Sequence, residues 1–236
     1  GDDLAALLAG AILAAGETAG PSDILVVTQK IVSKAEGRFV DLAGVTPGQR
    51  ALELAAVTLK DPRLVELVLA ESSTVLRAVP NVLIARHRSG HVMANAGVDR
   101  SNLGAGREDQ ALLLPVDADL SAARLRDALA LRWSPPPAIV ISDSFGRPWR
   151  MGVVNVALGA SGLPALVDRR GETDRDGRLL DETPVALADM VATAAGLATG
   201  EAAESVPAAL VRGVAWTADA RPAAALLRPL AEDLFR

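Results

Sequence analysis

Two short acidic segments of the chain combine residue types that bind metal ions and phosphates. In the first, Asp99 is followed by Ser101 and Asn102; in the second, Asp143 is followed by Ser144. Both segments contain a glycine, so we expect turns that let a ligand approach the backbone and leave the carboxylate free. Two such aspartates can converge on a hard divalent cation, which prefers carboxylate, hydroxyl and phosphate oxygens. For either segment taken alone, an ordinary turn with an Asx hydrogen bond is the simpler explanation.

Other charged side chains could contribute to the same chemistry. Glu201 follows a predicted helix end and offers a third carboxylate. Lys30 and Lys34 follow a predicted strand and are four residues apart, so they share one face if the segment is helical. Cations beyond a strand end suit phosphate oxygens, although a solvated helix face is the alternative.

The two histidines do not favour a metal site. His87 and His91 have the spacing of a zinc pair, but Arg88, Ser89 and Gly90 between them predict a hairpin turn. We therefore expect both histidines to be structural or exposed. The chain also lacks the Gly-x-x-x-x-Gly-Lys-Ser/Thr and Gly-x-Gly-x-x-Gly motifs, so any nucleotide must be bound without the two commonest phosphate-binding loops.

Composition narrows the class of protein. The chain has 236 residues, 50% of them hydrophobic but only 3% aromatic, so its core must be built from Ala, Leu and Val, in one large domain or two closely packed subdomains. The net charge of -5 disfavours a nucleic-acid partner. The absence of cysteine excludes disulfides and thiolate metal sites. The longest apolar run, residues 4–16, is too short to cross a membrane, so we expect a cytoplasmic protein without a membrane partner.

The order of predicted elements favours an α+β fold with mixed sheets and flanking helices. Apolar runs between turn residues predict strands at 23–28, 74–79, 82–87, 91–94, 138–141 and 208–211. Cap signals and helical spacing predict helices at about 3–15, 49–60, 62–72 and 184–198, and one more capped by Ser121. No regular βαβ repeat is visible. Asp143 is expected just beyond a strand end, where open α/β sheets tend to bind ligands.

Six of these segments, taken in order, resemble the coenzyme F420-0:γ-glutamyl ligase family. The matching blocks cover almost the whole chain, at residues 26–38, 96–102, 112–119, 141–147, 152–162 and 211–213. Any one of them would be a weak signal, but all six occur in the family's order. The resemblance implies a ligase that uses GTP and Mg²⁺ or Mn²⁺, with K⁺ as a further ion, to join L-glutamate to F420-0 through an acyl phosphate.

The resemblance also implies roles for particular residues. Asp99 and Asp143 would be catalytic, and the metal ligands would be Asp99, Asp143, Ser144 and Glu201. The GTP contacts would be Gln29, Lys34, Asn102, Thr199, Gly200, Glu201, Ala202, Ala203, Glu204, Ser205 and Val206. A homodimer is the expected assembly.

Three features depart from the family pattern. The chain begins at Gly1, just after the place of a Gly- and Pro-rich segment that contributes to the family's GTP site, so we expect that segment to be missing. Gln29 stands where a small hydroxyl residue is frequent. Ala202 and Ala203 stand where a glycine-rich phosphate loop is often found, and alanine would stiffen that loop.

The C-terminal residues resemble the exit from the ligase domain in two-domain members of the family. These residues are 226–230 and 233–235, and in the two-domain members a flavin-binding reductase domain follows. The chain is therefore interpreted as a stand-alone ligase or as one domain of a longer protein.

Two other functions use the same residues. The carboxylates could activate water in a metal-dependent phosphohydrolase. Alternatively, the chain could be a nucleotide-binding regulatory domain without turnover, which the expected loss of the N-terminal segment would allow. GTP hydrolysis that requires both F420-0 and glutamate would distinguish the ligase from both.

Overall fold

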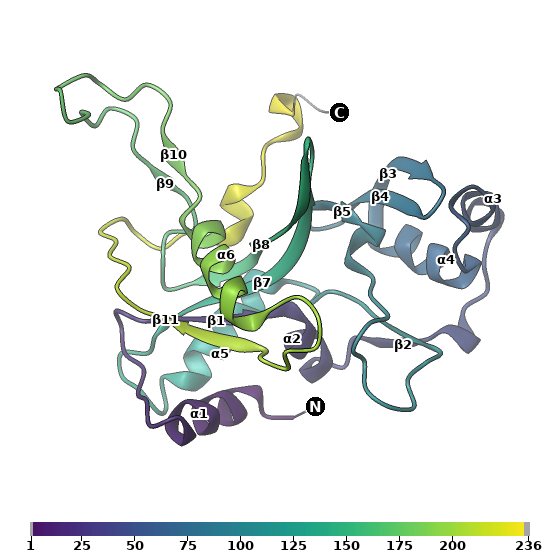
Figure 1. Ribbon diagram of the computed structural model, residues 1–236, viewed down its shortest axis with the longest axis horizontal. Coiled ribbons are helices and arrows are strands. Elements are labelled where there is room, and N and C mark those ends of the chain that lie inside the picture. Colours follow the sequence, from purple (N-terminus) through teal and green to yellow (C-terminus); the bar gives the residue numbers. More distant parts are fainter. Residues whose placement is uncertain (1, 234–236) are drawn as a thin grey trace.

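A four-stranded mixed sheet forms the centre of the computed structural model, which describes residues 2–233 (Figure 1). Its strand order is β11-β1-β7-β8, with β1 parallel to β7 and the other neighbours antiparallel. The bounds are β1 Ile24–Thr28, β7 Ala138–Arg147, β8 Arg150–Ser161 and β11 Ala208–Val211. Strands β7 and β8 are longer than the others and continue past the sheet as a twisted ribbon (Figure 1).

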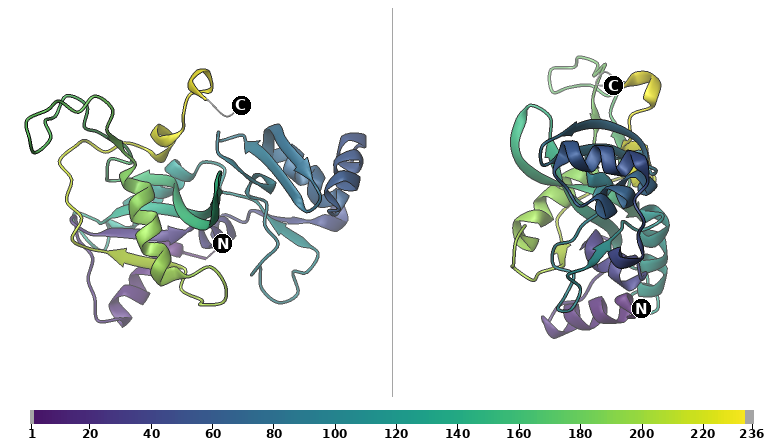
Figure 2. Two further views of the ribbon diagram at one scale, coloured as in Figure 1. Left: turned by 45° about the horizontal axis from the view of Figure 1, so that its top comes forward. Right: turned by 90° about the vertical axis from the view of Figure 1, so that its right-hand side faces the viewer.

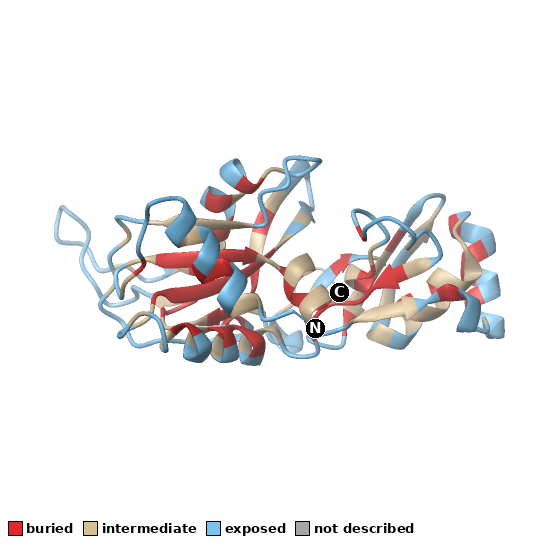
Figure 3. Cartoon of the chain, turned by 90° about the horizontal axis from the view of Figure 1, so that it is seen from below, coloured by how far each residue is buried: buried red, intermediate tan, exposed pale blue. Residues whose placement is uncertain are grey.

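Both faces of this sheet are covered, because successive side chains of the central strands point to opposite sides. Ile24, Val26 and Val140 pack against helix α6 (Leu187–Thr199). The alternate residues Leu25 and Val27 pack on the other side, against α1 (Leu4–Ala14), α2 (Gln29–Ala35) and α5 (Ala118–Leu129). Burial on both faces explains why the central strands are nearly continuous apolar runs. Residues 24–27 of β1 and 138–142 of β7 are buried, and Figure 3 shows buried strands at the centre of this part of the molecule.

A second hydrophobic cluster lies beside this sheet, on the right of Figure 1. It joins α3 (Gln49–Thr58) and α4 (Pro62–Glu71) to a three-stranded antiparallel sheet of β3 (Ser72–Val79), β4 (Val82–His87) and β5 (Val92–Ala94). The antiparallel pair β2 (Phe39–Asp41) and β6 (Gln110–Leu112) connects this part to the main sheet (Figure 2).

The remaining segments project from the main sheet or cross it. Strands β9 (Val167–Asp168) and β10 (Pro184–Val185) form the base of an exposed ribbon (Figures 1 and 2). The segment near the C-terminus is bonded to α5, because the backbone amides of Ala223 and Ala224 donate hydrogen bonds to the Asp119 carboxylate, at 2.7 and 3.1 Å. Residues 234–235, part of the predicted domain exit, lie outside the described residues. None of the helices within residues 2–233 is long and apolar enough to cross a membrane.

The α+β fold predicted from the sequence is confirmed, with three local corrections. Asp143 does not follow a strand end but lies inside β7, which extends to Arg147. Helix α5 is capped by Asp117, whose Oδ1 accepts from the Leu120 amide at 2.9 Å, and not by Ser121, which lies within the first turns. Helix α6 begins at Leu187 because Pro184 and Val185 pair with β9.

Close packing between β8 and α5 gives a test of this arrangement. A Cβ atom at Gly159 would lie 2.1 Å from the Ala118 carbonyl oxygen, a backbone atom that cannot move aside cheaply. We expect Gly159→Ala to lower the free energy of unfolding by about 1–3 kcal/mol. The matched control is Gly146→Ala on β7, where nothing lies within 4 Å of the added Cβ. Urea denaturation of both variants measures the difference, and equal stabilities would show that α5 does not pack as described.

Candidate functional site

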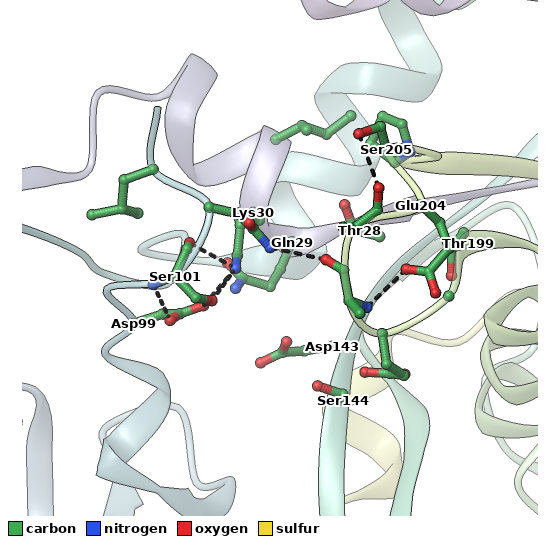
Figure 4. A pocket seen from close by; sticks show the side chains of 18 of the residues that line it. Thr28, Gln29, Lys30, Asp99, Ser101, Asp143, Ser144, Thr199, Glu204 and Ser205 are labelled. Atoms are coloured by element: carbon green, nitrogen blue, oxygen red, sulfur yellow. Dashed lines mark hydrogen bonds and ion pairs between the residues drawn. The ribbon is translucent and has the colours of Figure 1, made fainter. Parts of the chain in front are cut away.

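A cavity of about 890 Å³ opens at the edge of the main sheet. The end of β1 and the start of α2 form one wall, segment 99–108 a second, and segment 199–207 a third, with Asp143 and Ser144 of β7 between them (Figure 4). Every residue that the sequence analysis predicted for the site borders this cavity, although the predicted residues come from four separate stretches of the chain. Their roles as ligands remain predictions.

Asp99 is held at the cavity wall by a network of local hydrogen bonds. Its carboxylate accepts from the Ser101 amide at 2.7 Å and from the Ser101 hydroxyl at 3.0 Å, which is the Asx turn expected from the sequence. Lys30 Nζ lies 2.6 Å from Asp99 Oδ2. Burial raises the pKa of Asp99, but the bonds and charge of Lys30 and the bonds from Ser101 outweigh it, so that pKa lies below its usual range. Asp99 is therefore a paired carboxylate.

Asp143 is the opposite case. Burial, and to a lesser extent the nearby negative charge of Asp99, raise the pKa of the Asp143 carboxyl to about 7, against the hydrogen bond from the Ser144 backbone, which lowers it. Both carboxylates border the same cavity, so a negative charge on one disfavours a negative charge on the other. A carboxyl group with this pKa exchanges its proton near neutral pH, and a nearby cation would favour its ionised form.

The donor set in the cavity fits a hard cation that is shared with a phosphate. Asp99, Asp143, Ser144 and Glu201 offer only oxygen atoms. Within residues 2–233, however, no three His, Cys, Asp or Glu side chains lie close enough together to form a metal cage. Mg²⁺ is commonly bound by one or two carboxylates together with substrate phosphates, so these residues fit such a cation when a nucleotide supplies the remaining oxygens.

A basic wall faces the carboxylates. Lys34 Nζ donates to the Asn102 carbonyl oxygen at 2.6 Å, and burial, together with the charges of Lys30 and Arg107, lowers the pKa of Lys34. The Arg107 guanidinium stacks on the Phe39 ring, 3.9 Å from its centroid. Lys30 and Lys34 come from the same face of α2, as their spacing predicted. Close positive charges of this kind favour the binding of an anion.

The loop after α6 forms the third wall of the cavity. Gly200 ends the helix with φ 69°, and a Cβ there would lie 2.2 Å from the Glu204 side chain. Glu204 in turn accepts from the Ala202 amide at 2.8 Å. Asn102 Nδ2 donates to the Ala202 carbonyl oxygen at 3.2 Å, which joins this loop to the Asp99 segment. The loop is thus ordered by Glu204 and Asn102 even though alanines replace the glycines expected from the family.

Some residues of the cavity were not predicted from the sequence, and the two histidines lie elsewhere. Asn155 and Arg107 border the cavity. The signal for Asn155 is its position as one polar residue within an apolar strand, from Val153 to Ala157. His87 is buried and His91 is tied to it through the Ser89 hydroxyl at a tight turn, as expected for structural histidines.

The comparisons with known proteins identify the family to which the chain belongs. The family model for F420-0:γ-glutamyl ligase matches residues 1–213. The coenzyme F420:L-glutamate ligase of Methanothermobacter thermautotrophicus is 43% identical over 241 residues, which span 100% of this chain and 93% of the relative. The enzyme of the same name from Methanopyrus kandleri is also 43% identical, over 100% of this chain and 92% of the relative. That from Halobacterium salinarum is 45% identical over 90% and 81%. The chain belongs to the F420-0:γ-glutamyl ligase family, which confirms the resemblance seen in the sequence.

The raised pKa of Asp143 predicts a pH dependence of stability. The folded protein binds this proton more tightly than the unfolded chain, because the folded pKa of about 7 lies above the ordinary value of 3.8. The contribution of Asp143 to stability should therefore fall as the pH rises between these values, and Asp143→Asn should remove that loss. From pH 5 to pH 8, the variant should gain about 2–3 kcal/mol relative to the wild type.

Urea denaturation at the two pH values, in the presence of a chelator, measures this difference. Other groups with shifted pKa values are common to both proteins and cancel in the comparison. Parallel pH profiles for the wild type and Asp143→Asn would show that the carboxyl is not held in a desolvated position.

Proposed function

We propose that this chain joins L-glutamate to coenzyme F420-0 in a reaction driven by GTP and dependent on a divalent cation, Mg²⁺ or Mn²⁺. Membership of the family and the printed names of its relatives support the glutamate ligation. The observation that supports GTP and a cation is the cavity itself, in which Asp99 and Asp143 face Lys34 and its basic neighbours. The predicted homodimer, the K⁺ ion and the reductase domain remain predictions.

The proposed reaction has two steps. In the first, a carboxylate oxygen of F420-0 attacks the γ-phosphorus of GTP, GDP leaves, and an acyl phosphate forms. In the second, the amino nitrogen of glutamate attacks the acyl carbon, phosphate leaves, and the nitrogen loses a proton as the amide forms. Both steps need the reacting groups held together and the phosphate charge neutralised.

The chain's own residues supply the positioning and part of the charge. Lys34 and Lys30 lie where they can donate to phosphate oxygens, and Asn102 links the Asp99 segment to the loop at 199–206. Asp99, Asp143, Ser144 and Glu201 would hold the cation. When bound, the cation would neutralise charge on the terminal phosphates.

The test is mass spectrometry of F420-0 incubated with the protein, GTP, glutamate and either Mg²⁺ or Mn²⁺. The proposal predicts a product heavier by one or more glutamate residues, formed only with GTP and a divalent cation. GTP hydrolysis that is indifferent to F420-0 and glutamate would instead indicate a phosphohydrolase, and GTP binding without turnover would indicate a regulatory domain.

Lys34 offers a more specific prediction. If Lys34 contacts the GTP phosphates, Lys34→Ala should raise the KM for GTP about tenfold to a hundredfold, because a hydrogen bond to a charged group contributes about 1.5–3 kcal/mol. The KM for F420-0 should change less. Steady-state kinetics with each substrate varied in turn measures both values.

Lys60→Ala is the matched control, since Lys60 follows α3 and does not border the cavity. A KM for GTP that is the same in Lys34→Ala and Lys60→Ala would return Lys34 to the solvated-face interpretation.

A further inference from the structure

Asn155 is a buried amide in the middle of β8. Only 7% of its surface is exposed, and its sequence neighbours Val154 and Val156 are apolar. It borders the cavity, and in the register of the sheet it pairs with Ser144 on β7. A polar residue in such a strand costs free energy unless its hydrogen bonds are satisfied, so its partners indicate its purpose.

Beyond its pairing with β7, Asn155 makes hydrogen bonds to α6 and to the loop that follows it. The side-chain Nδ2 donates to Glu201 Oε1 at 2.7 Å. The main-chain oxygen of Asn155 accepts from the Thr193 hydroxyl, also at 2.7 Å. Asn155 thus connects the strand pair that holds Asp143 and Ser144 to the loop that holds Glu201.

Helix α6 has a gap where the Asn155 side chain lies. A Cβ at Gly196 would be 2.3 Å from Asn155 Nδ2, so no other residue type fits without moving the amide. Glycine inside a helix costs about 1 kcal/mol relative to alanine. Gly196 therefore destabilises α6 locally, at the position that faces the Asn155 amide.

Of the three carboxylates, Glu201 is the one whose position depends on the hydrogen bond from Asn155. Asp143 lies on a strand and Asp99 in a hydrogen-bonded turn, but Glu201 is exposed, in the loop after Gly200. Figure 4 shows Thr199 and Glu204, which flank Glu201 in sequence, across the cavity from Asp99. A flexible carboxylate there would have to be ordered each time a ligand binds.

We propose that Asn155 is a positioning residue that fixes the Glu201 carboxylate toward the cation and phosphates, and that Gly196 provides the space for its amide. The inference rests on the proposed function for its ligand. It assigns to Asn155 and Gly196 the supporting contact that a carboxylate on a loop requires.

The first experiment is a double-mutant cycle with Asn155→Ala and Glu201→Ala, assayed for glutamate addition as Mn²⁺ is varied. Asn155→Ala should raise the half-saturating Mn²⁺ concentration about tenfold or more, as loss of a partner that orients a metal ligand does. The KM for F420-0 should stay within about twofold, since the amide acts through Glu201. In the Glu201→Ala background, Asn155→Ala should have no further effect. Additive effects would overturn the proposal.

The second experiment compares two glycines in helices. Gly196→Ala should raise the Mn²⁺ requirement about as much as Asn155→Ala, although it removes no group from the cavity. Gly10→Ala in α1, where nothing lies within 4 Å of the new Cβ, is the control and should keep the wild-type Mn²⁺ requirement. Because alanine favours helices, Gly10→Ala should keep or raise Tm, whereas Gly196→Ala should lower it. A Gly196→Ala protein with wild-type Mn²⁺ dependence would contradict the proposal.

A third measurement separates this inference from the proposed function. Thermal unfolding of the metal-free wild type, the two single variants and the double variant of the cycle requires no activity. Non-additive changes in Tm would show that Asn155 and Glu201 are coupled, even if no glutamate were added to F420-0, in which case only the proposed function would fail. Additive changes in Tm would overturn the positioning of Glu201 by Asn155.

Discussion

The constraint on which the site depends is the placement of two carboxylates, Asp99 and Asp143, on facing walls of one cavity. Burial disfavours the charge of Asp143 and the neighbouring Asp99 disfavours it further, which is why the pKa of Asp143 is raised to about 7. The negative charge of Asp99 is instead stabilised by Lys30, whose Nζ lies 2.6 Å from Asp99 Oδ2. Of these two aspartates, Asp99 is therefore compensated by a charge of the chain, whereas Asp143 is not. A cation bound with phosphate would compensate the second.

The fold maintains this arrangement through elements of different rigidity. Asp143 lies on β7, which is covered on both faces of the sheet near its start, and its neighbours in the sheet fix its direction. Lys30 and Lys34 lie on α2, which directly follows β1. Because β1 pairs in parallel with β7, this strand pair sets the distance between the two lysines and the Asp143 carboxylate. Asp99 and Glu201 lie on loops and depend on local contacts, with Ser101 and Lys30 for the first and Asn155 for the second. The strand residue is held by the sheet, and the loop residues are held by side chains.

The sequence predicted the local features of this site better than the long-range ones. The Asx turn at Asp99 and the shared face of Lys30 and Lys34 follow from spacing alone, and both are present. The end of β7 was placed too early because the apolar run stops at Ile141, whereas pairing with β8 continues to Arg147. Ser121 is a residue type that often caps helices, but the cap of this helix lies four residues earlier, at Asp117.

The convergence of these segments could not be derived from residue types. Asn155 lies in β8 and Gly196 in α6, with the exposed ribbon between them in the chain, and only their contact in space shows that Gly196 makes room for the Asn155 amide. That all the predicted site residues border one cavity was expected only from the family resemblance.

The central claim is that the protein supplies only part of a cation site and that the nucleotide completes it. Calorimetric titration of Mn²⁺ tests this most directly, with the protein alone, with a nonhydrolysable GTP analogue alone, and with their complex. The account predicts that the complex binds Mn²⁺ more tightly than either component, since residues 2–233 contain no cluster of three His, Cys, Asp or Glu side chains that could hold a metal ion. Equally tight Mn²⁺ binding by the protein without nucleotide would contradict it.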